Sequence, residues 1–178
     1  MHSSEITLII GGGRSGKSSY GEAMAKAIEG NRLYIATAEV TDEEMAKRIE
    51  HHQKRRAGIF SQTIEEPLNL AGALSQIDKS VDVVLLDCLT VWLGNVIHYR
   101  GLQANYEEIE QFLAALKRCS QRVIVITNEV GQGIIPATAL SRHYRDHAGW
   151  LNQAVAAMAD RVIWMVAGLP VVVKGGSL

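Results

Sequence analysis

The chain has 178 residues, of which 47% are hydrophobic and 21% are charged, a composition and length that suit one globular domain. Its formal net charge of −1 provides no general attraction for nucleic acid or for an anionic membrane. The two cysteines, Cys88 and Cys119, have no zinc-ligand or disulfide-framework spacing, and the longest apolar run, 162–173, contains Gly168 and Pro170 and is too short to span a membrane. We therefore expect a cytoplasmic protein that neither binds nucleic acid nor crosses a membrane.

Short apolar runs rich in β-branched residues alternate with helical patterns along the chain. We predict strands at residues 6–10, 33–38, 81–87, 122–128 and 161–167, and helices at residues 17–28, 42–56, 68–76, 106–119 and 140–158. Continuous apolar runs of this kind are typical of strands buried on both faces of a parallel sheet, and their alternation with helices predicts βαβ crossovers. Residues 168–170 predict a turn into a last short strand, VVVK, which pairs antiparallel at the sheet edge.

The segment between the first predicted strand and the first predicted helix matches the phosphate-binding pattern G-x-x-x-x-G-K-[ST]. Glycines in such a loop allow backbone N–H groups to face phosphate oxygens, the lysine reaches the outer phosphates and the serine can ligate Mg²⁺. A glycine-rich turn without a ligand is the alternative, but the motif is complete and stands between a strand and a helix, as its function requires. It consists of Gly11, Gly12, Gly13, Arg14, Ser15, Gly16, Lys17 and Ser18.

Asp87 ends the apolar strand predicted at 81–87. An aspartate at a strand end is often only a turn residue, but after a complete phosphate loop it is expected to hold Mg²⁺ together with Ser18. These features predict an α/β fold of the P-loop NTPase, RecA-like class. We expect one domain over residues 1–178, built as a three-layer sandwich whose mostly parallel sheet has an antiparallel C-terminal edge strand.

The stretch RIEHHQKRR, residues 48–56, follows a capping box at residues 41–44 and is predicted to be helical. On this helix His52 lies near the buried stripe, which favours a structural role, whereas His51 points to a cationic face. That face is either solvated surface or a reactive site, because neighbouring cations keep an imidazole neutral and nucleophilic and also attract a polyphosphate. The cations around His51 are Lys47, Arg48, Lys54 and Arg55.

Together these motifs resemble a known family, the bifunctional adenosylcobinamide kinase / adenosylcobinamide-phosphate guanylyltransferases of cobalamin biosynthesis. The similarity rests on GGGRSGKS, LYIATA, DEEMAKRIEHHQKRR, TIEEPLNL, LLDCLTVWLGN, TNEVGQGIIP and RHYRDHAGWLNQAVAAMADRV, which cover nearly the whole chain in order. The resemblance implies phosphorylation of adenosylcobinamide with ATP or GTP, followed by transfer of GMP from GTP to the new phosphate with release of pyrophosphate. It also implies a homotrimer.

The resemblance also implies roles for individual residues. His51 matches the histidine that carries GMP as a covalent intermediate, in agreement with the helical-face interpretation, and Lys17 is the second catalytic residue. The residues expected to bind the nucleotide are the loop at 11–18, Thr37, Ala38, Glu39, Lys54, Arg55, Arg56, Glu65 and Asp87.

Two other functions remain compatible with the phosphate loop. A simple small-molecule P-loop kinase would use His51 only to line its acceptor site and would form no nucleotide adduct. A regulatory switch would bind nucleotide and signal to a partner, although the sequence contains neither a separate partner-binding segment nor an NKxD-type guanine-reading loop.

Several other residues are predicted to have structural rather than catalytic roles. Trp92, Trp150 and Trp164 are interpreted as packing residues rather than as cofactor-stacking groups. His147 is interpreted as a surface or capping group.

Overall fold

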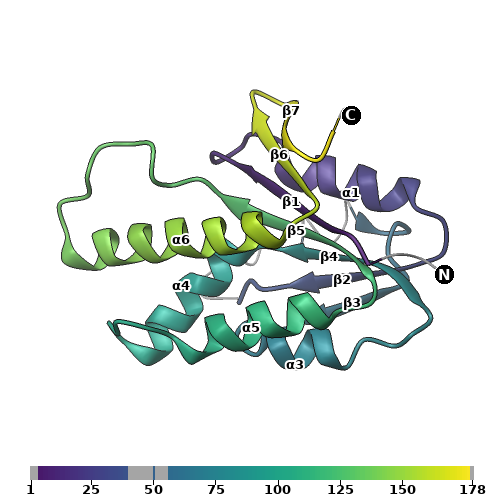
Figure 1. Cartoon of the computed structure of the whole chain (residues 1–178), viewed down its shortest axis with the longest axis horizontal. Coiled ribbons are helices and arrows are strands. Elements are labelled where there is room, and N and C mark those ends of the chain that lie inside the picture. Colours follow the sequence, from purple (N-terminus) through teal and green to yellow (C-terminus); the bar gives the residue numbers. More distant parts are fainter. Residues whose placement is uncertain (1–3, 40–49, 51–55, 177–178) are drawn as a thin grey trace.

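The computed structural model describes residues 4–39, 50 and 56–176, and its centre is a seven-stranded sheet with the order β3-β2-β4-β5-β1-β6-β7. Helices lie on both faces of this sheet (Figure 1). The strands are β1 Ile6–Gly11, β2 Asn31–Ala36, β3 Gln62–Glu65, β4 Val81–Asp87, β5 Arg122–Asn128, β6 Arg161–Val166 and β7 Leu169–Lys174. The helices are α1 Lys17–Ala27, α3 Leu70–Ser75, α4 Leu89–Arg100, α5 Glu107–Arg118 and α6 Ala139–Met158.

The pairing of the strands confirms the predicted fold class. All neighbours are parallel except β6 and β7, which are antiparallel. β5 lies between β1, which leads into the phosphate loop, and β4, which ends in Asp87. A strand inserted at this position is the RecA-like arrangement of the P-loop fold.

Each face of the sheet has its own hydrophobic core. On one face, Ala25 of α1 packs with the strand residues Ile9, Leu85 and Ile126. On the other face, α3, α4, α5 and α6 cover a larger core. The central strands are therefore buried on both sides, which explains why they are continuously apolar.

Two elements were not predicted from the sequence. β3 is a short edge strand with a mostly exposed, polar sequence, QTIE, so it lacks the apolar run that identifies the central strands. α4 has the opposite composition, because its sequence LTVWLGNVIHYR is apolar on most sides and shows no clear amphipathic period. The helix predicted at 42–56 lies outside the described residues apart from Glu50 and Arg56.

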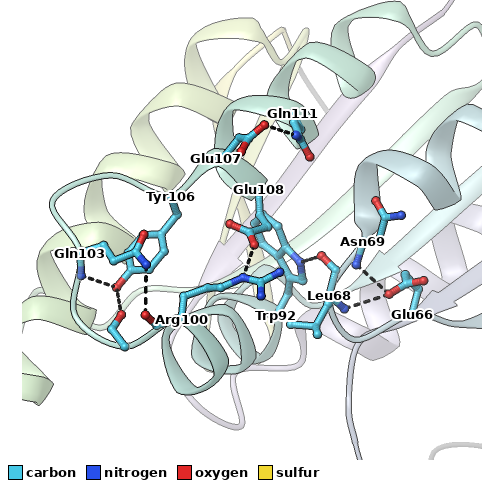
Figure 2. A network of polar contacts seen from close by, with 11 residues as sticks. Glu66, Leu68, Asn69, Trp92, Arg100, Gln103, Tyr106, Glu107, Glu108 and Gln111 are labelled. Atoms are coloured by element: carbon cyan, nitrogen blue, oxygen red, sulfur yellow. Dashed lines mark hydrogen bonds and ion pairs between the residues drawn. The ribbon is translucent and has the colours of Figure 1, made fainter.

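Polar contacts join the end of β3 to α4 (Figure 2). The Glu66 carboxylate accepts hydrogen bonds from the backbone N–H groups of Leu68, at 2.9 Å, and Asn69, at 2.7 Å. The indole Nε1 of Trp92, on α4, donates to the Leu68 carbonyl at 2.8 Å. This network fixes the chain immediately after Glu65, a predicted nucleotide-binding residue.

The structure agrees with some of the roles predicted for tryptophan and histidine residues and contradicts others. Trp92 is fully buried, as expected of a packing residue, but Trp150 is 59% exposed and Trp164 is 36% exposed, so packing was a wrong interpretation for Trp150 in particular. The surface interpretation of His147 is also wrong. This side chain is buried, with Nδ1 at 3.0 Å from the His143 carbonyl and Nε2 at 3.3 Å from the Ala104 carbonyl.

Within the described part of the chain, no helix has both the length and the apolarity needed to cross a membrane.

Helix α1 depends on Gly21 for its close approach to the sheet. A Cβ atom at this position would lie 3.1 Å from Ile126 Cδ1 and 3.1 Å from Leu85 Cδ1. We expect Gly21→Val to lower the free energy of unfolding by about 1–3 kcal/mol, because overpacking displaces neighbouring side chains. Chemical denaturation measures this change.

Gly149, on α6, is the matched control for Gly21. A Cβ atom there would meet nothing within 4 Å, so Gly149→Val is expected to raise the free energy of unfolding by no more than about 0.5 kcal/mol, through helix propensity alone. Equal effects of the two substitutions would contradict the close packing of α1.

Candidate nucleotide-binding and group-transfer site

Parallel pairing brings the carboxyl ends of several strands to one edge of the sheet. Ala36, the last residue of β2, is in register with Glu65 of β3 and with Asp87 of β4. Gly11, at the end of β1, is in register with Asn128 of β5. The described residues of the predicted site therefore lie along the same edge, the usual place for a ligand in an open α/β sheet.

The phosphate loop has the backbone conformation that its glycines predict. Gly16 is the N-cap of α1 and has a left-handed conformation with φ of 93°, and no side chain caps this helix end. Arg14 also has a positive φ, of 57°. The N–H groups of the first helical turn are thus available to an anion.

The side chain of Lys17 folds back onto the phosphate loop and does not extend into solvent. Its side chain is buried, and Nζ donates to the Gly12 carbonyl at 2.5 Å and lies 3.4 Å from Ser15 Oγ. Burial lowers the pKa of Lys17, while the neighbouring Cys88 and Asp87 oppose this shift. The ammonium group is therefore desolvated and held close to the end of β4, in a position to receive an anionic ligand.

Asp87 is held by a tyrosine that connects it to the end of the histidine-containing segment. The Tyr34 hydroxyl donates to Asp87 Oδ2 at 3.0 Å, and burial together with the Asp87 charge raises the pKa of Tyr34, so that the hydroxyl keeps its proton. The Arg56 guanidinium lies over the Tyr34 ring, 4.0 Å from its centroid. Figure 1 shows β2, which carries Tyr34, next to β4, which carries Asp87.

This series of contacts, Asp87–Tyr34–Arg56, places Arg56, a cation predicted to bind the nucleotide, in the candidate site. Arg56 is buried, and a cation over an aromatic face at this distance contributes about 0.5–2 kcal/mol. Three other predicted residues, His51, Lys54 and Arg55, lie outside the described residues.

Thr37 braces the turn that follows Asp87. Its side chain is fully buried, and Oγ1 donates to the Cys88 carbonyl at 2.8 Å and accepts from the Cys88 N–H at 2.9 Å. The Thr37 N–H in turn donates to the Asp87 carbonyl at 3.2 Å. The Thr37 hydroxyl therefore fixes the turn at Cys88, directly after Asp87, and the predicted position of Thr37 against the nucleotide stays a prediction.

The residues that follow Thr37 are anchored to α4. Asn95 Nδ2 donates to the Thr37 carbonyl at 2.9 Å. The Glu39 carboxylate accepts from the Tyr99 hydroxyl, with both of its oxygens at 3.2 Å. Ala38, another predicted nucleotide-binding residue, lies between these two anchored positions.

An open pocket of about 320 Å³ lies beside the Asp87–Tyr34–Arg56 series. The Phe60 ring, which borders the pocket, contacts Tyr34 edge to face with the ring centroids 5.1 Å apart. The pocket thus combines an aromatic surface, a guanidinium and a carboxylate. Its lining residues are Arg56, Ala57, Phe60, Thr63 and Glu65.

Several residues of the site were missed by the sequence analysis. Tyr34 carried a usable signal, since a hydroxyl within a buried apolar strand must have a hydrogen-bonding partner. Phe60, Asn95 and Tyr99 carried none, because their roles depend on contacts between segments that are distant in the sequence.

The oxygen groups of Ser18 and Asp87 fit Mg²⁺, which prefers oxygen ligands and retains several waters and phosphate oxygens. Where the structure describes the chain, no group of three or more His, Cys, Asp or Glu side chains is arranged to hold a metal ion. A cation at this edge would thus have few protein ligands, as in other phosphate-loop sites.

The sheet order and the loop define a P-loop nucleotide-binding protein of the RecA-like class. A solved structure from Pyrococcus horikoshii OT3 has a similar fold, with a TM-score of 0.59 at 9% identity over 99% of this chain and 89% of that chain. At the level of sequence, the family model for cobinamide kinase / cobinamide phosphate guanyltransferase matches residues 7–173.

Curated relatives agree with this match. The bifunctional adenosylcobalamin biosynthesis protein CobP of Pseudomonas aeruginosa is 43% identical over 96% of this chain and 98% of its own length. CobU of Escherichia coli K12, with the same description, is 39% identical over 95% of this chain and 99% of its own length. The chain therefore belongs to the cobinamide kinase / cobinamide phosphate guanyltransferase family, whose members are transferases.

The brace formed by Thr37 can be tested with two substitutions. Thr37→Val keeps the shape of the side chain but leaves the Cys88 N–H and carbonyl without this partner, so we expect unfolding to become easier by about 1–3 kcal/mol. Thr37→Ser keeps the hydroxyl and is expected to lose less. Denaturation of both variants, alongside their nucleotide turnover, measures the effect, and similar losses in both would show that the hydroxyl is not the important group.

Proposed function

We propose that this chain phosphorylates the hydroxyl group of adenosylcobinamide with ATP or GTP and then transfers GMP from GTP to that phosphate through a guanylylated His51. Membership of the family supports both reactions. The observation that carries the second reaction is the Asp87–Tyr34–Arg56 series, because it joins the end of the histidine-containing segment to the phosphate-binding edge of the sheet.

In the kinase step, the substrate hydroxyl oxygen attacks the γ-phosphorus of the nucleotide. The bond from this phosphorus to the β–γ bridging oxygen breaks, the nucleoside diphosphate leaves and the hydroxyl proton is released. Lys17 and the N–H groups at the start of α1 stabilise the negative charge on the transferred group.

In the guanylyltransfer step, a neutral imidazole nitrogen of His51 attacks the α-phosphorus of GTP, and pyrophosphate leaves. A phosphate oxygen of adenosylcobinamide phosphate then attacks the same phosphorus, the P–N bond breaks and adenosylcobinamide-GDP forms. The covalent intermediate divides one transfer into two displacements, and Lys54, Arg55 and Arg56 supply positive charge.

Mg²⁺ fits this site through Ser18 and Asp87, and when bound it would neutralise charge on the phosphate oxygens. The Tyr34 hydroxyl restrains the Asp87 carboxylate, and Thr37 holds the turn behind it. These residues keep Asp87 oriented before any ligand binds.

We also propose that the pocket beside Arg56 receives the guanine base of GTP. Guanine presents its N1–H and 2-amino donors side by side, and Glu65 offers a carboxylate that can accept both, while Phe60 offers an apolar ring surface. Adenine does not present that pair of donors, so the pocket favours guanine where GMP is transferred.

Three further properties belong to this proposal. The enzyme is taken to act as a single domain in the cytoplasm, where both nucleotides are available, and to assemble as a homotrimer, as the family resemblance implies.

The covalent intermediate gives the sharpest test of the proposed function. After incubation with Mg²⁺ and GTP at neutral pH, intact-mass and peptide mass spectrometry are expected to find GMP on the peptide that contains His51. The adduct is expected to disappear in His51→Ala, to persist in the neighbouring control His52→Ala, and to be discharged by adenosylcobinamide phosphate.

Other outcomes would favour the alternative functions. Consumption of nucleotide and acceptor without any adduct would indicate a simple small-molecule kinase. Slow hydrolysis with a large nucleotide-dependent change in affinity for a protein partner would indicate a regulatory switch.

Glu65→Gln tests the proposed guanine pocket. The amide replaces one of the two acceptor oxygens with a donor, so we expect the preference for GTP over ATP in formation of the His51 adduct to fall about 10- to 100-fold. Glu29→Gln, the same change on the exposed surface, is the control. An unchanged preference in Glu65→Gln would place the base elsewhere.

A further inference from the structure

The turn between β6 and β7 lies directly against the phosphate loop. The Gly168 N–H donates to the Ser15 carbonyl at 3.1 Å, and a Cβ atom built on Gly16 would lie 3.4 Å from Gly168 Cα. At the start of the loop, a Cβ atom on Gly11 would lie only 2.5 Å from the carbonyl oxygen of Met165 in β6. The C-terminal hairpin therefore packs on the loop through backbone atoms.

This contact has a geometric consequence for the loop. The peptide bond between Ser15 and Gly16 is trans, so its carbonyl and its N–H point in opposite directions. A hydrogen bond that holds the Ser15 carbonyl outward, toward the hairpin, therefore turns the Gly16 N–H to the other side. In a phosphate loop the inner side is the one that faces the ligand.

The turn needs a particular backbone conformation to reach the loop. Val166 and Leu169 form the last pair of the hairpin, and the two residues between them, Ala167 and Gly168, have φ angles of 51° and 82°. Positive φ at both central residues is typical of a type I′ turn, which strongly favours Gly or Asn. Gly168 provides this conformation, and a Cβ atom there would meet nothing within 4 Å.

We propose that Gly168 is a positioning residue for nucleotide binding, because its N–H fixes the Ser15–Gly16 peptide group so that the Gly16 N–H faces the phosphates. The inference rests on the proposed binding of the nucleotide by residues 11–18. It assigns the C-terminal hairpin a role in both reactions, since both use a nucleoside triphosphate.

Two substitutions of the same residue separate backbone conformation from side-chain bulk. Valine is strongly disfavoured at positive φ, so Gly168→Val is expected to rearrange the turn and lose the hydrogen bond, whereas Gly168→Asn is expected to keep it. A Cβ atom at this position would meet no atom within 4 Å, so a difference between the two variants reflects the backbone conformation of the turn and not a steric clash of the Cβ atom. Gly168→Ala is a milder variant that serves if the valine protein does not fold.

The measurement is calorimetric binding of a non-hydrolysable ATP analogue and of AMP, each with Mg²⁺, together with the KM and kcat of the kinase reaction. We expect Gly168→Val to raise the Kd of the triphosphate analogue and the KM for ATP about tenfold, with smaller changes in kcat and in the Kd of AMP. Gly168→Asn is expected to restore most of the wild-type affinity.

Two controls distinguish this inference from a general loss of stability and from a failure of the proposed site. Val172→Ala weakens the hairpin away from the turn and is expected to lower Tm without changing the Kd of the analogue. Lys17→Ala is expected to abolish triphosphate binding.

Each result has a defined meaning. Wild-type affinity in Gly168→Val, or equal losses in Gly168→Val and Gly168→Asn, would overturn the positioning role while leaving the proposed site intact. Full binding by Lys17→Ala would instead overturn the proposed nucleotide site itself.

Discussion

The hydrogen bond between the Tyr34 hydroxyl and the Asp87 carboxylate is the interaction on which the arrangement of the site depends. A hydroxyl in the middle of a buried strand must find a partner, and here the partner is the acidic residue at the end of the neighbouring strand. The same tyrosine uses its ring face to hold Arg56. One side chain therefore sets the direction of a carboxylate and the position of a guanidinium, two groups of opposite charge that act on the same polyphosphate in the proposed function.

This arrangement suits an enzyme that performs two phosphorus chemistries with one phosphate loop. The kinase reaction acts at the γ-phosphorus and guanylyltransfer acts at the α-phosphorus, so the site must offer positive charge along the whole triphosphate. We propose that Lys17 supplies it at the loop and that Arg56 supplies it on the far side of Tyr34. In the proposed mechanism, the remaining cations of the histidine-containing segment continue this series toward the inner phosphate.

Much of the fold followed from the sequence, because the central strands are apolar over their whole length and the phosphate loop has a fixed pattern. The antiparallel C-terminal strand was also predicted, from the turn residues that precede it. The missed elements have physical explanations. β3 is too short and polar to show a strand pattern, and α4 is too uniformly apolar to show a helical one.

The site was predictable where a motif fixes local geometry and unpredictable where geometry comes from contacts between distant segments. Asp87 and the residues of the loop could be named from their place after strands. The brace that Thr37 provides for the turn after Asp87 joins residues about fifty positions apart, and no local pattern contains it. The outward position of Trp150 is a similar case, since burial depends on what covers a helix face and not on the residue type alone.

The short polar strand β3 has an evolutionary consequence. In the proposed function, the carboxylate that reads the base stands at the end of an edge strand, whereas the loop that holds the phosphates follows a central strand. Substitutions at an edge are tolerated more easily than substitutions between two cores. The choice of nucleobase is therefore free to diverge between descendants of this enzyme while the machinery for phosphate transfer is inherited unchanged.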